Sequence, residues 1–324
     1  MTDKPLVSVL LPLYNEPVKI AMEAIYSICN QTYRHLEIFL LLDNPNNKEL
    51  LDLLQMVTTN DTRITLIVNE KNIGLPQTLN KGIDLATGEY IARMDADDIS
   101  MPERIENQLV YLLKHPEIHL VGCDAFIIDE DGIQTGYYSK LRTDFSHKIF
   151  LRHCASSLIH PTWMGTIELF KRCKYRDFLS GQDYDFLLRA YAYGFNFHNL
   201  KKGLLKYRIP KHSLRSISCS HAYEQYVNAK LAKEQFLEFK RTGKFSPLPR
   251  LRYDLEDKEK YMAGIPLLNQ LRESFLKKQY VLSFKLTCQI IRVDKRLIMG
   301  RMKSNLFAKG LSLLELFSKQ WEKY

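Results

Sequence analysis

Short apolar runs alternate with amphipathic segments along the first 130 residues, and this alternation constrains the fold more than any other feature. The runs cover residues 6–11, 37–42, 64–68, 90–94 and 120–128. Runs this short and this apolar are typical of strands that are buried on both faces, as in a mostly parallel sheet. We therefore expect the chain to cross one sheet repeatedly.

The segments between the runs carry apolar side chains at helical spacing. The shared faces comprise Ile20, Ala24, Ile25 and Ile28 in one segment and Leu75, Leu79, Ile83 and Ala86 in another. Ser100 and Glu103 precede a third apolar stripe in the pattern of a capping box, which predicts a helix from about Ser100. Strands and helices in this order predict an α/β fold with a doubly wound, mostly parallel sheet.

Beyond residue 130 the alternation weakens, and the 324-residue chain divides by pattern and charge. Residues 181–185 open a further predicted helix, and the turn-rich, basic stretch 207–220 is expected to end the first domain. Residues 1–200 hold 19 Lys and Arg against 26 Asp and Glu, whereas residues 201–324 hold 27 against 11. We predict an α/β domain at 1–220 and a basic, helical C-terminal region at 221–324.

The last segment of the chain is an amphipathic, cationic stretch. Its stripe comprises Ile298, Met302, Leu306, Leu313, Phe317 and Trp321, with Arg301, Lys303, Lys309 and Lys319 off the stripe. Such a helix fits either docking on an anionic membrane surface or packing on the first domain, and the sequence leaves both open. Nucleic acid is not an expected partner, because no binding motif accompanies the charge.

Composition indicates the compartment. The six cysteines show no C-x-x-C spacing, which favours free thiols in a reducing compartment over disulfides or a zinc site. No secretory signal pattern opens the chain, and no apolar run approaches the roughly 18 to 20 residues that span a bilayer. We expect a cytoplasmic protein, peripheral at the inner face of the cell membrane if the C-terminal region docks there.

Polar residues follow three of the predicted strands directly. They stand at 12–16 after the first strand, at Asp43 after the second and at 95–98 (DADD) after the fourth. Ligands gather beyond the carboxyl ends of the strands in such sheets. Asp95 and Asp97 can point to the same side, and their oxygens suit Mg²⁺ or Mn²⁺. On spacing alone, the better explanation of these acids is that they favour the N-terminus of a following helix.

Seven motifs stand in a fixed order between residues 6 and 215. They are 7–16 (VSVLLPLYNE), 31–33 (QTY) with 37–38 (EI), 72–74 (NIG) with 79–82 (LNKG), 86–91 (ATGEYI), 95–98 (DADD) up to 102–104 (PER), His160-Pro161-Thr162, and 182–189 (QDYDFLLR). Together they resemble family 2 inverting glycosyltransferases of the GT-A type, in particular those of bacterial surface polysaccharides and capsules.

The resemblance implies transfer of a sugar from a nucleoside-diphosphate sugar to a hydroxyl of a glycan or lipid-linked acceptor, with UDP the favoured nucleotide. It implies Mn²⁺ or Mg²⁺ as cofactor and inversion at the anomeric carbon. Pro12, Tyr14 and Glu16 resemble the loop that lines the base and ribose, and Asp43 resembles the acid that hydrogen-bonds the base.

Further roles follow from the acidic motifs. Asp95 and Asp97 resemble the Asp-x-Asp pair, with Asp97 the more direct metal ligand and Asp98 assigned to the helix entry. Asp183 resembles the base that deprotonates the acceptor. The alternative for Asp183 and Asp185 is that both are simply first-turn acids of a helix.

Softer assignments concern three residues downstream of the acidic motif. The resemblance implies Arg208 as a nucleotide-sugar-binding cation and His212 as a metal ligand, the alternative for His212 being a solvated loop histidine. Trp163 fits stacking on a sugar ring or an ordinary core position equally. His160 belongs to a motif without an assigned role.

Two positions depart from the family pattern. Asn44 replaces a second acid after the second strand, which puts the identity of the donor base in doubt. Gln182 replaces a glutamate before the base, and a neutral amide cannot raise the pKa of Asp183 by like-charge repulsion.

Rival classes fit less well. A processive synthase would carry membrane spans and a Gln-x-x-Arg-Trp motif, and a nucleotidyltransferase would open with a glycine-rich phosphate loop. The remaining alternative is a non-catalytic relative that binds a nucleotide sugar. Such a relative is expected to lose Asp183 or the Asp-x-Asp pair, and this chain keeps both.

Overall fold

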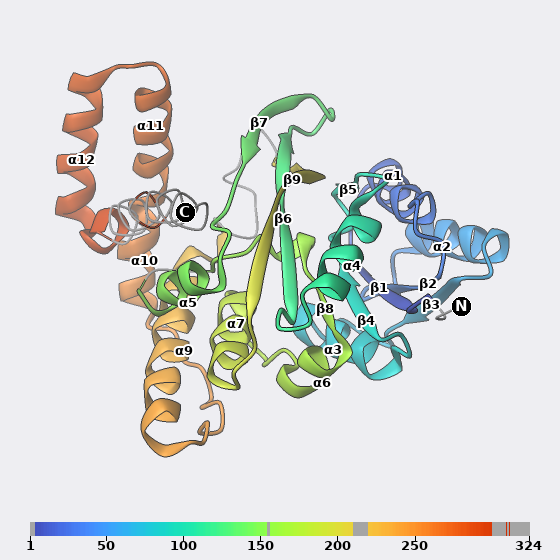
Figure 1. Ribbon diagram of the computed structural model, residues 1–324. Coiled ribbons are helices and arrows are strands. Elements are labelled where there is room, and N and C mark those ends of the chain that lie inside the picture. The colour runs from blue at the N-terminus through green and yellow to red at the C-terminus, as the bar shows by residue number, and fades with distance from the viewer. Residues whose placement is uncertain (1–3, 154–155, 210–219, 300–308, 310, 312–324) are drawn as a thin grey trace, which may run out of the picture.

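The structure is a computed structural model that describes residues 4–153, 156–209, 220–299, 309 and 311 (Figure 1). Its strands are β1 (Val7–Leu13), β2 (Leu36–Leu42), β3 (Ile64–Val68), β4 (Tyr90–Arg93), β5 (Ile99–Ser100), β6 (Leu120–Ile128), β7 (Gln134–Tyr138), β8 (Met164–Thr166) and β9 (Phe197–Arg208). Its helices are α1 (Val18–Cys29), α2 (Lys48–Asn60), α3 (Leu75–Leu85), α4 (Arg104–Lys114), α5 (Asp144–His153), η1 (His160–Thr162), α6 (Ile167–Cys173), α7 (Gln182–Ala192), α9 (Ala222–Thr242), α10 (Leu255–Ala263), α11 (Ile265–Leu276) and α12 (Tyr280–Asp294).

The strands form one mixed sheet in the order β3-β2-β1-β4-β8-β6-β9-β5, with β7 paired to β6. β1 pairs in parallel with β2 and with β4, and β2 pairs in parallel with β3. β8 runs antiparallel between β4 and β6. The carboxyl ends of β1, β2, β3 and β4 therefore meet at one edge, as the apolar runs predicted.

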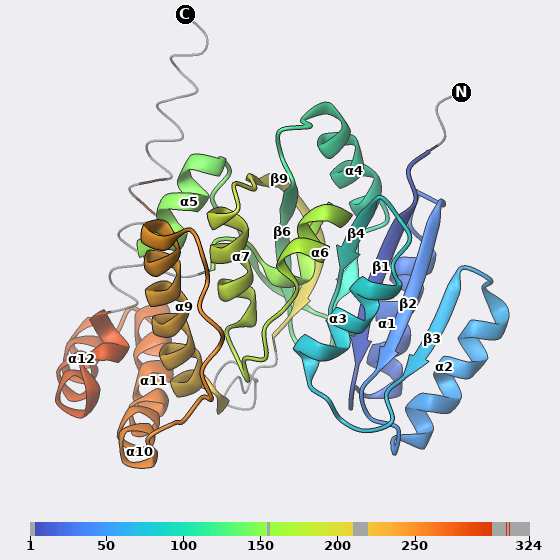
Figure 2. The same cartoon turned by 90° about the horizontal axis from the view of Figure 1, so that it is seen from below.

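Helices cover both faces of this sheet (Figure 2). On one face, alternate residues of β1 such as Val9 and Leu11 pack with apolar side chains of α1, α2 and α4. On the other face, Leu10 and residues of β2 pack with α3, α6 and α7. Because both faces of β1 are buried, the strand reads as a continuous apolar run. The doubly wound α/β class is confirmed.

The helix predicted from Ser100 begins instead at Arg104, so the capping-box interpretation is wrong. Ser100 lies in β5, which pairs antiparallel with β9. Its hydroxyl accepts hydrogen bonds from Arg104 Nε at 2.9 Å and from Gln31 Nε2 at 3.0 Å. A buried arginine and a buried amide need acceptors, and they take the oxygen that a cap would have used.

Strand β9 was not predicted from the sequence. Its residues 207 and 208 were assigned to a loop, yet they pair with Ile127 and Ile128 of β6. The ladder between β6 and β9 shifts register around Asp124, and Lys201 and Lys202 are exposed. Apolar and polar residues therefore do not alternate regularly along β9, and the sequence pattern of a strand is missing.

The C-terminal region is helical, as predicted. Helix α9 packs Ala232 and Phe236 into the core that contains Phe186 of α7. Helices α10, α11 and α12 share a separate apolar cluster around Leu268 and Ile290. Within the described residues no helix is long and apolar enough to cross a membrane. The predicted amphipathic stripe beyond residue 299 lies outside the described part of the chain.

Candidate active site

Three carboxylates gather just beyond the end of β4. Oxygens of Asp95, Asp97 and Asp98 lie within 4.8 Å of one another, so the two-residue spacing does place Asp95 and Asp97 on one side of the chain. Asp95 and Asp97 are accessible to solvent, and Asp98 is fully buried. Each of the three meets different partners, and these partners separate their roles.

Asp95 is held by Arg93, the last residue of β4. Arg93 Nη1 donates to Asp95 Oδ2 at 2.9 Å, and Nη2 donates to Oδ1. The Arg93 side chain is almost fully buried, so its charge requires a paired carboxylate. The Asp95 charge is therefore largely balanced by the protein itself.

Asp98 does not belong to a helix entry, which corrects that prediction. It precedes β5, and its Oδ1 accepts from the backbone N–H of Arg208 at 2.8 Å. Burial, and then the charges of Asp97 and Asp95, raise the pKa of Asp98 well above its ordinary value. Its contact fixes the loop after β4 to the end of β9.

The side chain of Arg208 also holds the loop after β4 in place. Its Nε donates to the backbone oxygen of Asp97 at 2.8 Å, and its Nη1 donates to backbone oxygens of Asp129 and Glu130. Its Nη2 donates to Glu23 Oε2 at 2.8 Å. The Arg208 side chain is 4% exposed. In this structure Arg208 therefore supports the acidic loop and is not accessible to a phosphate group.

Asp97 is the member of the cluster with the least compensation. Among the described residues no lysine or arginine forms an ion pair with it. Burial, followed by the charges of Asp95 and Glu16, raises the pKa of Asp97 to about 7. A bound cation would offset the burial and the like-charge repulsion that disfavour the charged form of Asp97. The carboxylate oxygens of this cluster therefore fit a hard divalent ion.

The loop after β1 lies at the same edge. Pro12 is buried within β1 and Tyr14 is 44% exposed, with its backbone N–H donating to Glu16 Oε2 at 2.7 Å. Burial raises the pKa of Glu16 against that hydrogen bond, and the charge of Asp95 adds to the rise. Glu16 therefore extends the acidic cluster.

Asp43 organises the loop that follows β3. Its Oδ1 accepts from Asn69 Nδ2 and from the backbone N–H of Ile73, both at 2.9 Å, and its Oδ2 accepts from the backbone N–H of Gly74 at 2.8 Å. Only 6% of Asp43 is exposed. The motif at 72–74 is thus tied to the end of β2, and contact of Asp43 with a nucleobase stays a prediction.

Asp183 stands in the first turn of α7 and is partly exposed. Gly181 precedes the helix with φ of +82°, a left-handed conformation that glycine adopts without strain. Asp185, two residues on, is buried and receives Arg176 Nε at 3.1 Å and Arg189 Nε at 2.9 Å. The first-turn pair therefore divides into an accessible acid and a structural one.

Tyr175 is a buried residue whose hydroxyl is influenced by the charges of both acidic regions. Its hydroxyl is 2.8 Å from His160 Nε2, and burial raises the pKa of Tyr175 above its ordinary range. The charges of Arg93, Asp183 and Asp95 all act on the pKa of this tyrosine, so both acidic regions lie within electrostatic range of its hydroxyl. Burial, helped by Arg93, lowers the pKa of His160 well below its ordinary value and keeps the imidazole neutral.

The remaining sequence assignments concern Trp163 and His212. Trp163 is fully buried, with its ring 4.5 Å from that of His160 and 5.4 Å from that of Phe186. It is a core residue, and the sugar-stacking interpretation is wrong because no face is open. His212 lies outside the described residues.

Sequence reasoning missed Arg93, Glu23 and Tyr175. A signal existed for Arg93, since an arginine within an apolar strand needs an acid, and Asp95 follows two residues later. Nothing local marks Tyr175, which reaches the site because Asn80 holds both its backbone N–H and its carbonyl at 2.7 Å.

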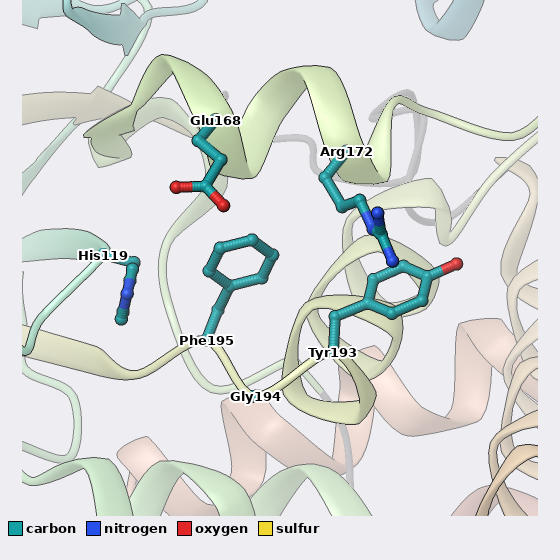
Figure 3. A pocket seen from close by; sticks show the side chains of 6 residues that line it. All are labelled: His119, Glu168, Arg172, Tyr193, Gly194 and Phe195. Carbon is teal, nitrogen blue, oxygen red and sulfur yellow. The ribbon is translucent and has the colours of Figure 1, made fainter. Parts of the chain in front are cut away.

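A cavity of about 380 Å³ lies elsewhere, between α6 and the turn after α7 (Figure 3). It is lined by His119, Glu168, Arg172, Tyr193, Gly194 and Phe195. His119 immediately precedes β6, which runs parallel to β4 in direction, so this cavity lies at the opposite edge of the sheet from Asp95. None of the predicted site residues lines it.

Comparison with known families agrees with this geometry. Residues 8–172 match the family described as Glycosyl transferase family 2. The chain belongs to glycosyl transferase family 2. The matched part of this glycosyltransferase contains the cluster at 95–98 and ends before Asp183.

Curated relatives carry the same family name. An uncharacterised glycosyltransferase of Methanocaldococcus jannaschii is 37% identical over 230 residues, 69% of this chain and 79% of its own length. The O-antigen biosynthesis glycosyltransferase WbnJ of Escherichia coli is 29% identical over 247 residues, 73% of this chain and 91% of its own. Relatives in polysaccharide biosynthesis are therefore among the similar proteins.

Solved structures share the fold. The mannosyltransferase PcManGT of Pyrobaculum calidifontis, in complex with GDP-Man and Mn²⁺, superposes with a TM-score of 0.57 at 15% identity, covering 90% of this chain and 86% of that one. The 1–349 portion of S. aureus TarS, in complex with UDP, gives a TM-score of 0.52 at 18% identity, covering 81% and 80%. At these identities the likeness shows the GT-A type fold.

Proposed function

We propose that this glycosyltransferase transfers a sugar from a nucleoside-diphosphate sugar, with UDP the favoured nucleotide, to an acceptor hydroxyl with inversion. The observation that supports this proposal is that each acidic region holds a solvent-accessible carboxylate with which no described arginine or lysine forms an ion pair. Asp97 is that carboxylate after β4, and Asp183 is its counterpart in α7.

The donor half of the site is the edge formed by the loops after β1, β2 and β4. Asp97 would hold Mn²⁺ or Mg²⁺, and a divalent ion there supplies charge stabilisation to the departing diphosphate. Arg93 neutralises Asp95, which supports Asp97 as the direct ligand and leaves Asp95 to orient the ribose or the ion's water. Pro12, Tyr14, Glu16 and Asp43 would surround the base and ribose.

The acceptor half is Asp183. Its carboxylate would take the proton of the acceptor hydroxyl while that oxygen attacks the anomeric carbon from the side opposite the diphosphate. The bond between the anomeric carbon and the phosphate oxygen breaks, and the diphosphate leaves with the electron pair. One displacement of this kind inverts the anomeric centre without a covalent enzyme intermediate.

The names of two relatives support a proposal for the acceptor class. WbnJ is named for O-antigen biosynthesis and AmsE of Erwinia amylovora for amylovoran biosynthesis, and AmsE is 29% identical over 216 residues, 62% of this chain. We propose a glycan or a lipid-linked saccharide as acceptor, in the synthesis of a cell-surface polysaccharide. A lipid-linked acceptor would place the enzyme at the inner face of the cell membrane.

A thermal-shift screen of nucleotide sugars, each with and without Mn²⁺, tests the donor half. A bound donor stabilises the folded state by mass action, about 2.7 kcal/mol at a hundredfold excess over Kd. We expect stabilisation that needs both nucleotide and metal in the parent and is lost in Asp97→Asn, while the control Asp52→Asn on α2 keeps it. Stabilisation by no nucleotide sugar would contradict the proposal, and stabilisation without any transfer would favour a non-catalytic binding protein.

A further inference from the structure

Helix α12 carries an apolar face that no described residue covers. Val281 is 73% exposed, Phe284 71% and Ile291 50%. At 3.6 residues per turn these three side chains fall within about 80° of arc on the helix. Scattered apolar residues are ordinary on a protein surface, but three on one face of one helix form a continuous stripe.

The opposite face of the same helix is already used. Leu286 and Ile290 are buried in the cluster that joins α12 to α10 and α11. Helix α12 is therefore fixed in place by its inner face, and Val281, Phe284 and Ile291 point away from the cluster. In both views α12 forms the outer arm of the C-terminal helices, on the side of the molecule away from α1 and α2 (Figures 1 and 2).

Cations stand beside the stripe. Lys285 and Arg292 lie within about 40° of Val281 on the helix, and all three side chains are exposed, as is Lys295 just after the helix ends. The one acid of α12, Asp294, is buried against Arg296 on the inner side. The outer face thus combines apolar side chains with positive charge and carries no acid.

We infer that the outer face of α12 docks on an anionic lipid surface. Interfacial helices bind membranes when an apolar face enters the headgroup boundary and neighbouring Lys and Arg meet anionic lipids, and each such cation typically adds about fivefold in affinity. A self-associating face would instead bring Lys285, Arg292 and Lys295 of two copies together, which like-charge repulsion opposes. This inference does not depend on the proposed chemistry, because lipid binding is measured without a donor or an acceptor.

The test is sedimentation of the full chain with vesicles of phosphatidylcholine alone or mixed with phosphatidylglycerol. We expect binding to the anionic vesicles only. The triple variant Val281→Gln, Phe284→Gln and Ile291→Gln should bind at least about tenfold more weakly, because it removes three side chains that would leave water. The matched control replaces Met56, Leu113 and Leu237, exposed on α2, α4 and α9, by glutamine and should bind like the parent.

A charge variant keeps the inference testable if the apolar variant misfolds. Lys285→Gln with Arg292→Gln and Lys295→Gln should lose on the order of 100-fold in affinity for anionic vesicles. Equal binding to both vesicle types, or unchanged binding by both triple variants, would overturn the inference. So would light scattering that shows a dimer of the parent which the apolar variant converts to a monomer, because the face would then join two copies.

Discussion

The acidic cluster after β4 and the acidic pair at the start of α7 both place carboxylates close together in the sequence, but the surroundings of these carboxylates differ. In each, arginine side chains hold one carboxylate, and another has no arginine partner within the part of the chain that the structure describes. Arg93 holds Asp95, and Arg176 with Arg189 holds Asp185. The difference lies in what surrounds the remaining acid.

Asp97 lies among other carboxylates, and burial with their charge raises its pKa to about 7. The acids of its own motif do not repel Asp183 in this way. Arg176 and Arg189 neutralise Asp185, and residue 182 is an uncharged glutamine. An acid among acids suits a cation, whereas a separate, accessible acid suits a proton. The comparison teaches that arginine partners, and not the spacing of the acids, distinguish Asp95 from Asp97 and Asp185 from Asp183.

The largest expected effect is on the rate of transfer. Asp183→Asn removes the proton acceptor and should slow transfer by about 10²- to 10⁴-fold, with donor affinity unchanged within about twofold. Steady-state and single-turnover assays with the donor found by the thermal-shift screen measure both quantities. Transfer at the parent rate would show that the base lies elsewhere.

The next effect is on stability and concerns the other member of the pair. Asp185→Asn leaves the guanidinium groups of Arg176 and Arg189 without a counter-charge, and should lower the free energy of unfolding by about 3 kcal/mol. Urea unfolding measures this loss. Asp183→Asn is the matched control, with an expected change within about 0.5 kcal/mol. A similar loss of unfolding free energy in both variants would contradict the assignment of Asp185 as the structural acid and Asp183 as the accessible one.

A smaller effect tests the support of the cluster after β4. Arg208→Lys keeps the charge but cannot bridge Glu23, residues 129 and 130, and the backbone of Asp97 at once. We expect metal-dependent donor binding to weaken by about tenfold, as for other groups that orient ligands. Calorimetry measures it, with Lys201→Gln on the exposed part of β9 as the control. If Arg208 contacted the diphosphate directly, binding would weaken without metal as well.

The smallest effect concerns the packing behind α7. His147 of α5 is fully buried, and burial with nearby cationic groups lowers its pKa to about 3. The unfolded chain takes up a proton on this residue near pH 6.5 and the folded chain does not, so stability falls as the pH drops below about 6.5.

The pH dependence of unfolding measures this contribution. In His147→Phe, the decline in the free energy of unfolding between pH 6 and 5 should be shallower by about 1 kcal/mol per pH unit. His115→Gln, at a partly exposed histidine, serves as control. An unchanged slope in His147→Phe would mean that this imidazole becomes protonated in the folded protein.

The sequence predicted the fold through burial that is local in the chain. β1 and β2 are mainly apolar because both of their faces are buried, whereas β3 is partly exposed at the edge of the sheet. The boundaries of all three strands were correct to within about two residues. β9 was missed because its bulged pairing with β6 is set by distant partners. Ser100 was misread because its hydroxyl serves Gln31 and Arg104 and not a helix end.

For the site, the sequence predicted which acids lie close together but not which of them are paired with arginines. The spacing of Asp95 and Asp97 brought their oxygens together, as expected. The pairing of Asp185 depends on Arg176, and the attachment of Asp98 depends on the backbone of Arg208; both arise from tertiary contacts. Trp163 shows the same limit, since only packing distinguishes a buried indole from one that faces a ligand.

Calorimetric titration of UDP in the presence of Mn²⁺ into the parent, Asp97→Asn and Asp183→Asn tests the division between the two acids most directly. The expected result is metal-dependent binding to the parent and to Asp183→Asn with equal affinity, and a loss of about 100-fold or more in Asp97→Asn. Should Asp97→Asn bind UDP and Mn²⁺ like the parent while Asp183→Asn does not, the two carboxylates would have the opposite roles.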